Sequence, residues 1–106
     1  MEITSSFKEN LSQLPTRENI TSLTILDSDD NHIGTIENKP GQAGSLVVYC
    51  YLKDRFSFIT PEAAELGLKI YAEHTDDARL NPGKHPNIDR LFSIIDSKKT
   101  MKVISN

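Results

Sequence analysis

Apolar residues near the start of the chain recur with a helical period, which predicts a short amphipathic helix. Its apolar stripe consists of Phe7, Leu11 and Leu14, at positions i, i+4 and i+7. Ser6 stands at the expected N-cap, three residues before a glutamate, which is the spacing of a capping box. Pro15 has no N–H to donate and disfavours a helical residue before it, so we expect the helix to end there.

In the next part of the chain the apolar period changes to two, as in a β-strand. Two runs rich in β-branched residues, 20–26 and 33–36, flank a cluster of turn-forming residues at 27–31. This arrangement predicts a β-hairpin with a loop longer than two residues. The loop starts like a calcium-binding loop, but His32 occupies the position that needs glycine and Asn38 that of the bidentate glutamate. We therefore interpret it as a plain hairpin loop.

The apolar segment 46–52 fits two kinds of secondary structure. Its composition is typical of a buried strand. Ser45 is nevertheless a good helix N-cap, and Leu46, Tyr49 and Cys50 have the spacing of one helix face. We expect a helix here, and the sequence leaves a strand open as the alternative.

The segment that follows carries strong signals for a helix start and a helix end. Thr60 and Pro61 supply an N-cap and a proline at the first helical position. Apolar residues then recur at helical spacing, so we expect one long helix that ends near Leu80. The sequence Asn81-Pro82-Gly83 after it excludes further helix.

The last part of the chain completes the predicted fold. A further amphipathic helix is expected to begin with Asn87 as its N-cap and to continue through Ile95. Met101, Val103 and Ile104 should form a last strand on the edge of the hairpin, because a two-stranded hairpin alone is marginally stable. The predicted fold class is α+β, with a small sheet (the hairpin plus a C-terminal edge strand) and helices packed on one face.

Length and composition restrict the class of protein. With 106 residues, the chain should form a single globular domain over residues 1–106. Its 37% hydrophobic and 25% charged residues are ordinary for a soluble protein. No apolar run approaches the roughly 18 residues of a membrane span, and the N-terminus does not resemble a secretory signal. The formal net charge of -3 argues against nucleic acid as a partner.

Cys50 is the only cysteine of the chain. A single cysteine excludes an internal disulfide and a thiolate zinc site, and it fits a reducing cytoplasm. Because it lies in an apolar run, we expect burial to raise the pKa of its thiol and to leave it unreactive.

A glycine-rich loop precedes the ambiguous segment and is a candidate anion site. Flexible glycines allow backbone N–H groups to converge, and a helix N-terminus adds partial positive charge. No Walker or dinucleotide fingerprint is present, and a tight strand-to-helix connection explains the same residues. The candidate residues of this loop are Gly41, Gly44 and Ser45.

The densest group of chemically active side chains surrounds the junction between the last two predicted helices. His74 and Asp77 are three residues apart, so both can lie on one helix face. If the two helices are antiparallel, the turn between them places His85 beside His74. Two imidazoles and two carboxylates suffice for a divalent metal site or for a general base held by an acid, although the helix dipole alone explains an aspartate in a first turn. The basic side chains of the same group, with His85, could instead bind an anion. No zinc motif is present, so we expect neither metal nor cofactor. The candidate ligand-binding residues are His74, Asp77, Arg79, Lys84, His85, Asp89 and Arg90.

Two stretches of the chain resemble a known family. They are IENKPGQAGSL at 36–46 and AEHTDDAR at 72–79, which continues into NPGKHPNIDRL at 81–91. Together they are similar to a family of short bacterial proteins described only as domain of unknown function 2322. The resemblance covers nearly the whole chain and implies a bacterial cytoplasmic protein. It favours a helix at 46–52, because relatives carry fewer β-branched residues there, and it implies no activity.

The absence of a strong catalytic motif favours binding over catalysis. We expect a non-catalytic interaction or assembly module, whose C-terminal strand offers an edge to a protein partner or to a second copy in a homodimer. The alternative is a protein or enzyme that binds a small anionic or phosphorylated metabolite around His74 and His85. The alternative gains strength if both histidines converge in a cleft with the loop 41–44.

Overall fold

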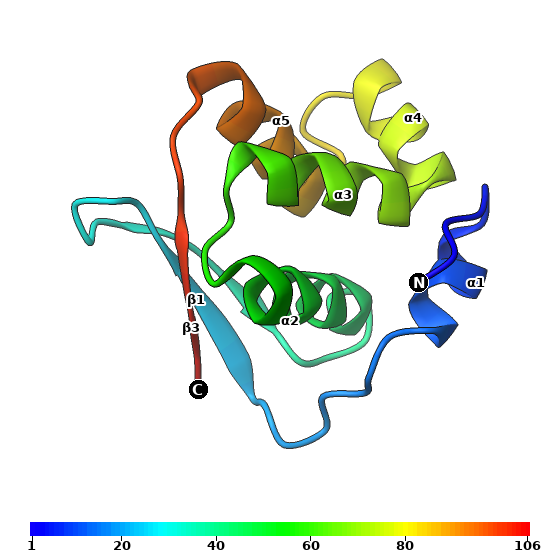
Figure 1. Ribbon diagram of the computed structural model, residues 1–106, viewed down its shortest axis with the longest axis horizontal. Helices are drawn as coiled ribbons and strands as arrows, with labels where there is room; N and C mark the ends of the chain where they lie inside the picture. Colours follow the sequence, from blue (N-terminus) through cyan, green and yellow to red (C-terminus); the bar gives the residue numbers. More distant parts are fainter.

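Five helices and a three-stranded antiparallel sheet make up the computed structural model, which describes residues 1–106 (Figure 1). The α+β class, with helices packed on a small sheet, is confirmed. In chain order the elements are α1 (Phe7–Ser12), β1 (Ser22–Leu26), β2 (His32–Glu37), α2 (Ala43–Phe56), α3 (Pro61–Tyr71), α4 (Glu73–Leu80), α5 (Pro86–Ser97) and β3 (Lys102–Ser105).

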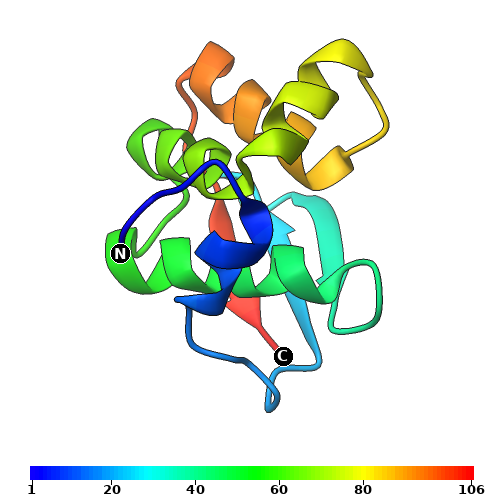
Figure 2. The same ribbon diagram turned by 90° about the vertical axis from the view of Figure 1, so that its right-hand side faces the viewer.

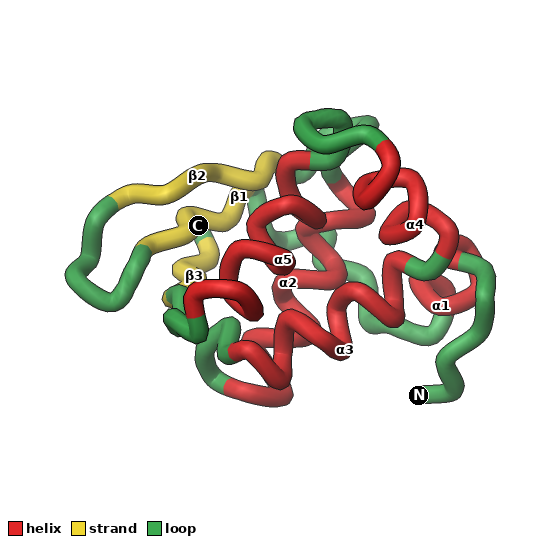
Figure 3. Tube along the Cα trace, turned by 90° about the horizontal axis from the view of Figure 1, so that it is seen from above, coloured by secondary structure: helices red, strands yellow, loops and turns green.

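The sheet has the strand order β2-β1-β3, with both neighbouring pairs antiparallel. The hairpin and the C-terminal edge strand are therefore as expected. Alternate residues of each strand face the helices, and Leu23, Ile25, Ile36 and Val103 are buried there. Seen from above, the sheet lies at one side of the molecule and the helices fill the other (Figure 3). The helices thus cover one face of the sheet.

The ambiguous segment 46–52 is helical and belongs to α2, which packs directly on the sheet (Figure 1). Its strand-like composition has a simple cause, since this helix is buried on several sides and needs apolar residues around most of its circumference. The expected N-cap is wrong. The helix begins at Ala43 after Gln42, whose side chain forms no capping bond, and Ser45 lies inside the first turn.

The single long helix expected up to Leu80 is also wrong, because the chain breaks it at Ala72, where φ is 52°. Thr60 does cap α3, and its hydroxyl accepts the Ala63 N–H at 3.1 Å. At the other end of α3, side chains satisfy backbone carbonyls. The buried Asn10 donates to the Ile70 carbonyl at 3.1 Å, and Thr75 donates to that of Leu68 at 2.6 Å. These contacts redirect α4 away from the axis of α3.

The start of α5 lies two residues earlier than expected, and this difference matters for the site. The N-cap position is His85 rather than Asn87, and the helix begins with Pro86, which needs no N–H partner there. Asn87 is thereby free for other contacts. Its side-chain oxygen accepts a hydrogen bond from Arg90 at 2.9 Å.

A glycine sets the contact between α3 and α5. A Cβ atom at Gly67 would lie 2.8 Å from a methyl group of Leu91 and 3.0 Å from one of Leu52. The absence of a side chain therefore lets the two helices approach closely. Beneath them, Cys50 is buried and unpaired, and burial raises the pKa of its thiol as expected. No helix is both long and apolar enough to cross a membrane.

Candidate functional site

The cleft, as we call it below, is a cavity of about 390 Å³ between the start of α2, the junction of α3 and α4, and the start of α5. The loops that precede α2 and α5 lie on the same side of the molecule (Figure 2). Each loop contains a glycine with positive φ, 90° at Gly41 and 91° at Gly83, which other residues rarely adopt. The cleft is lined by Phe7, Gly41, Gly44, Ser45, Tyr71, His74, Lys84, His85, Pro86, Asn87 and Ile88.

The structure thus brings together two loops that the sequence offered as separate candidates. All three residues of the glycine-rich loop line the cleft, and so do His74, Lys84 and His85. The rings of His74 and His85 are 5.8 Å apart between centroids. The convergence on which the small-ligand alternative depended is therefore present.

Asp77 lies behind the cleft and holds two of its basic side chains. Its Oδ2 atom is 2.7 Å from Nε2 of His85 and 2.9 Å from Nζ of Lys84. The hydrogen bonds from His85 and then Lys84 lower the pKa of Asp77 to about 2. The carboxylate is therefore charged at neutral pH, and its position fixes both partners at the rim of the cleft.

One wall of the cleft is aromatic, a feature that the sequence did not predict. The Phe7 ring stacks on Tyr71 at 5.2 Å and meets the His74 ring edge-on at 5.1 Å. Phe7 comes from α1, whose first N–H donates to the Glu73 carboxylate at 2.7 Å. Phe7 was predicted only as part of a core stripe, and its place in the cleft follows from the bend at Ala72 rather than from a local pattern.

The polar groups opposite this wall belong to α2 and α5. The Tyr71 hydroxyl donates to Ser45 Oγ at 2.7 Å. Burial raises the pKa of Tyr71 well above its ordinary value, so the phenol remains a donor. Asn87 lines the cleft from the first turn of α5.

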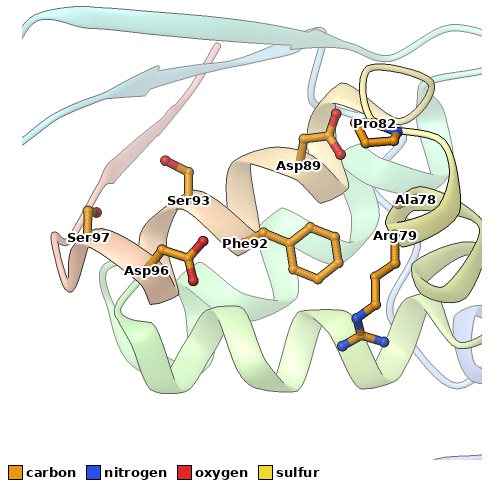
Figure 4. Close-up of a pocket in the computed structure, with 8 residues that line it drawn as sticks. All are labelled: Ala78, Arg79, Pro82, Asp89, Phe92, Ser93, Asp96 and Ser97. Atoms are coloured by element: carbon orange, nitrogen blue, oxygen red, sulfur yellow. The ribbon is translucent and has the colours of Figure 1, made fainter.

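Four of the seven residues predicted around the histidines do not line the cleft: Asp77 lies behind it, and the other three lie elsewhere. Arg79 and Asp89 lie on a second hollow on the other side of α4 (Figure 4). Arg90 points toward the sheet, where its guanidinium packs on the Tyr49 ring at 5.6 Å and would collide with any Cβ at Gly34. Nor do His, Cys, Asp and Glu side chains form a group of three or more able to hold a metal ion.

The second hollow, which we call the groove, consists of two adjoining cavities of about 670 and 940 Å³ between α3, α4 and α5. Arg79 and Phe92 line both cavities, with the guanidinium 5.2 Å from the centre of the ring (Figure 4). Five carboxylates and two cations surround an apolar floor, a formal net charge of −3. These residues are Glu65, Glu73, Asp76, Asp89 and Asp96, with Lys69 and Arg79, around Leu68, Phe92 and Ile95.

Fold and cleft together define a small α+β protein with a hollow at the ends of three helices. The chain belongs to the family described as an uncharacterized protein conserved in bacteria, domain of unknown function 2322, whose model matches residues 7–105. The family resemblance is therefore confirmed. Neither the curated proteins nor the solved structures contain a significant match to the chain.

Proposed function

We propose that the cleft binds a small organic anion. The observation that carries this proposal is the convergence of Lys84, His74 and His85 with the glycine-rich loop around one cavity. A lysine supplies positive charge, the two imidazoles can donate hydrogen bonds, and the first turn of α2 adds backbone N–H groups. Asp77 does not oppose an anion strongly, because Lys84 and His85 already bind its carboxylate.

The size and the aromatic wall of the cleft support an organic ligand rather than a bare ion. A volume of about 390 Å³ lies in the range of pockets that hold small metabolites. Stacked Phe7 and Tyr71 offer an apolar surface to the carbon part of such a ligand. We assign binding rather than catalysis, and place it in the bacterial cytoplasm, which suits a free buried cysteine.

The experiment that tests this proposal is a titration followed by two-dimensional amide NMR, with inorganic phosphate, citrate and adenosine monophosphate as probes. We expect shifts confined to His74, the loop 84–87 and the loop 41–45. Lys84→Ala should weaken binding about tenfold, as expected for the loss of a charged hydrogen bond. Lys99→Ala, at an exposed lysine at the end of α5, is the matched control and should change nothing. Absence of shifts with all three probes would reject the proposal.

The groove favours a second candidate function, the interaction module expected from the sequence. Its acidic rim and half-buried floor match a basic segment with apolar anchors on a partner protein. Arg79 already makes in the groove the contacts that we expect from a basic residue of such a partner. Its guanidinium packs on the Phe92 ring and lies 3.4 Å from Asp76.

A synthetic amphipathic peptide of leucine and lysine tests this second candidate. We expect it to shift amides along the groove, and the same peptide with glutamate in place of lysine to shift none. Arg79→Gln should tighten binding about threefold by removing a competing charge. Arg55→Gln is the matched control. Arg55 also lies over an aromatic ring, that of Phe56, but it belongs to α2 and does not line the groove. Equal binding of both peptides would exclude a charge-complementary partner.

Self-association through the sheet is a second form of the proposed interaction module. Ile33 and Ile104 are 43% and 46% exposed on the face of the sheet away from the helices, and β3 is an edge strand. Sedimentation at increasing concentration tests this form, since Ile104→Lys should abolish a homodimer that pairs through β3. A protein that stays monomeric at high concentration would exclude it.

A further inference from the structure

Two polar side chains of the cleft, Ser45 and Asn87, share a property that narrows the class of ligand. In each, the side-chain oxygen already accepts from a protein donor, whereas its own donor hydrogens are free. Ser45 Oγ accepts the Tyr71 hydroxyl at 2.7 Å, which leaves its own hydrogen for another partner. Asn87 Oδ1 accepts Arg90 Nη1 at 2.9 Å, and its Nδ2 group has no partner in the protein.

Arg90 fixes which way the Asn87 amide faces. A guanidinium has only donors, so the amide oxygen must face it, and a flipped amide would set donor against donor. Arg90 is itself held, because Nη1 also donates to Tyr49 Oη at 3.2 Å and the guanidinium packs on the Tyr49 ring. Tyr49 in turn donates to the Asn87 carbonyl at 2.6 Å. Arg90 is therefore a positioning residue that acts on the cleft through Asn87.

The Asp77 carboxylate behind the cleft is also occupied by protein donors. Asp77 Oδ2 accepts from both Lys84 and His85, while the Lys84 ammonium keeps donors beyond the one it uses there. The first turn of α2 adds backbone N–H donors, because Gln42 provides no side-chain cap. Side chains and backbone from three elements thus offer donors to the same cavity.

We infer that the anion recognised in the cleft is the phosphate group of a phosphate monoester, an inference that rests on the proposed function of the cleft. Such a group brings three terminal oxygens, nearly two negative charges and at most one hydrogen. A carboxylate offers fewer acceptors and one charge, and an amine brings donors that would face donors. The phosphate lies between Ser45, Lys84 and Asn87, and the organic part lies against the aromatic wall of Phe7 and Tyr71.

Three probes with the same ring test this inference against the broader one. Phenyl phosphate, benzoate and benzylamine are titrated into the protein, with the amides of the cleft as the readout. We expect phenyl phosphate to bind about tenfold more tightly than benzoate, for the additional charged hydrogen bonds, and benzylamine to cause no shift. Equal binding of phenyl phosphate and benzoate would overturn the choice of phosphate and leave an anion site. Failure of both anions would overturn the proposed function as well.

Variants of the donor residues sharpen the test. Asn87→Asp replaces a free donor by a negative charge and should reduce affinity for phenyl phosphate about tenfold or more. Ser45→Ala removes only one hydroxyl and serves if the first variant does not fold. Asn106→Asp adds the same charge at the C-terminus and should leave affinity unchanged. Retention of wild-type affinity by both Asn87→Asp and Ser45→Ala would contradict the inference.

The positioning role of Arg90 predicts a change in selectivity. Arg90→Met frees the Asn87 amide, so the preference for phenyl phosphate over benzoate should fall about threefold or more. Arg90→Lys keeps a donor and should restore much of that preference. A uniform loss of both ligands, with their ratio unchanged in Arg90→Met, would show that Arg90 acts only through stability.

Discussion

The cleft and the groove lie on opposite faces of α4, and they differ in their polar groups: hydrogen-bond donors surround the cleft, and carboxylates surround the groove. His74 lines the cleft, and Asp77 binds Lys84 and His85 at its rim. Asp76 and Arg79 line the groove. A helix of eight residues thus separates a cavity rich in donors from one rimmed by carboxylates. The formal net charge of the groove, −3, equals that of the entire chain, −3. The residues that line the cleft, in contrast, include a lysine and two histidines and no carboxylate, so the net charge of the whole chain does not describe this cavity.

The two hollows share one mechanical support, the close contact of α3 and α5 at Gly67. The largest effect we expect comes from Gly67→Val, because a branched side chain there collides with Leu91 and Leu52. The free energy of unfolding should fall by about 3 kcal/mol, measured by urea denaturation, and ligand binding at both hollows should weaken together.

Gly67→Ala is the graded control for this substitution. Its single methyl group meets the ends of flexible leucines, and alanine gains about 1 kcal/mol in helix propensity, so the loss should be much smaller. A Gly67→Val variant as stable as the wild type would show that the two hollows do not depend on this contact.

A crossed pair of substitutions sharpens the comparison between the hollows. Lys84→Ala should weaken phenyl phosphate about tenfold and leave the leucine–lysine peptide unaffected. Asp96→Lys, at an exposed acid of the groove, should weaken the peptide by a few-fold, roughly as surface charges do, and leave phenyl phosphate unaffected. Calorimetric titration of both variants with both probes measures the four affinities. Any variant that weakens both probes would contradict two independent sites.

The elements predicted well from the sequence are those whose signals are local. The caps at Ser6 and Thr60 and the hairpin depend on neighbours within a few residues, and the structure confirms them. The bend at Ala72 could not be predicted in this way. The contacts at this bend include that of Asn10, which is 60 residues from the carbonyl that it binds, while the helical period of the sequence continues unbroken across the bend.

The candidate site shows the same division. Residue types marked out the histidine loop and the glycine-rich loop separately, and the turn between α4 and α5 places His85 beside His74. The roles of Asn87 and Tyr71 were not visible, because a first-turn asparagine fits an N-cap and an apolar-face tyrosine fits the core. Only the contacts to Arg90 and Ser45 show how these side chains are oriented.

The pH dependence of the cleft follows from Asp77, whose pKa of about 2 lies below its ordinary value of 3.8. A depressed pKa contributes stability above the unfolded value, and this contribution is lost as pH falls from about 4 toward 2. We expect the Asp77 carboxyl carbon to titrate near pH 2 in an NMR experiment. His85→Ala should move the midpoint upward, because the largest cause of the depression is removed, and an unchanged midpoint would contradict this pairing.

The smallest effect that we expect concerns the aromatic wall of the cleft. Ser6 caps α1 by accepting the Glu9 N–H at 3.3 Å, and α1 carries Phe7 into the aromatic wall. Ser6→Ala should reduce the free energy of unfolding by about 1 kcal/mol. It should also speed hydrogen exchange in α1 while the amides of α5 keep their protection.

Ser5→Ala, one position earlier and exposed, is the matched control and should leave both quantities unchanged. Phenyl phosphate should then bind the Ser6→Ala protein slightly more weakly, because Phe7 is held less firmly, while the peptide in the groove binds as before. Equal losses at both hollows would mean that α1 supports the whole helical layer. In that case the difference between cleft and groove would rest on charge alone and not on separate mechanical support.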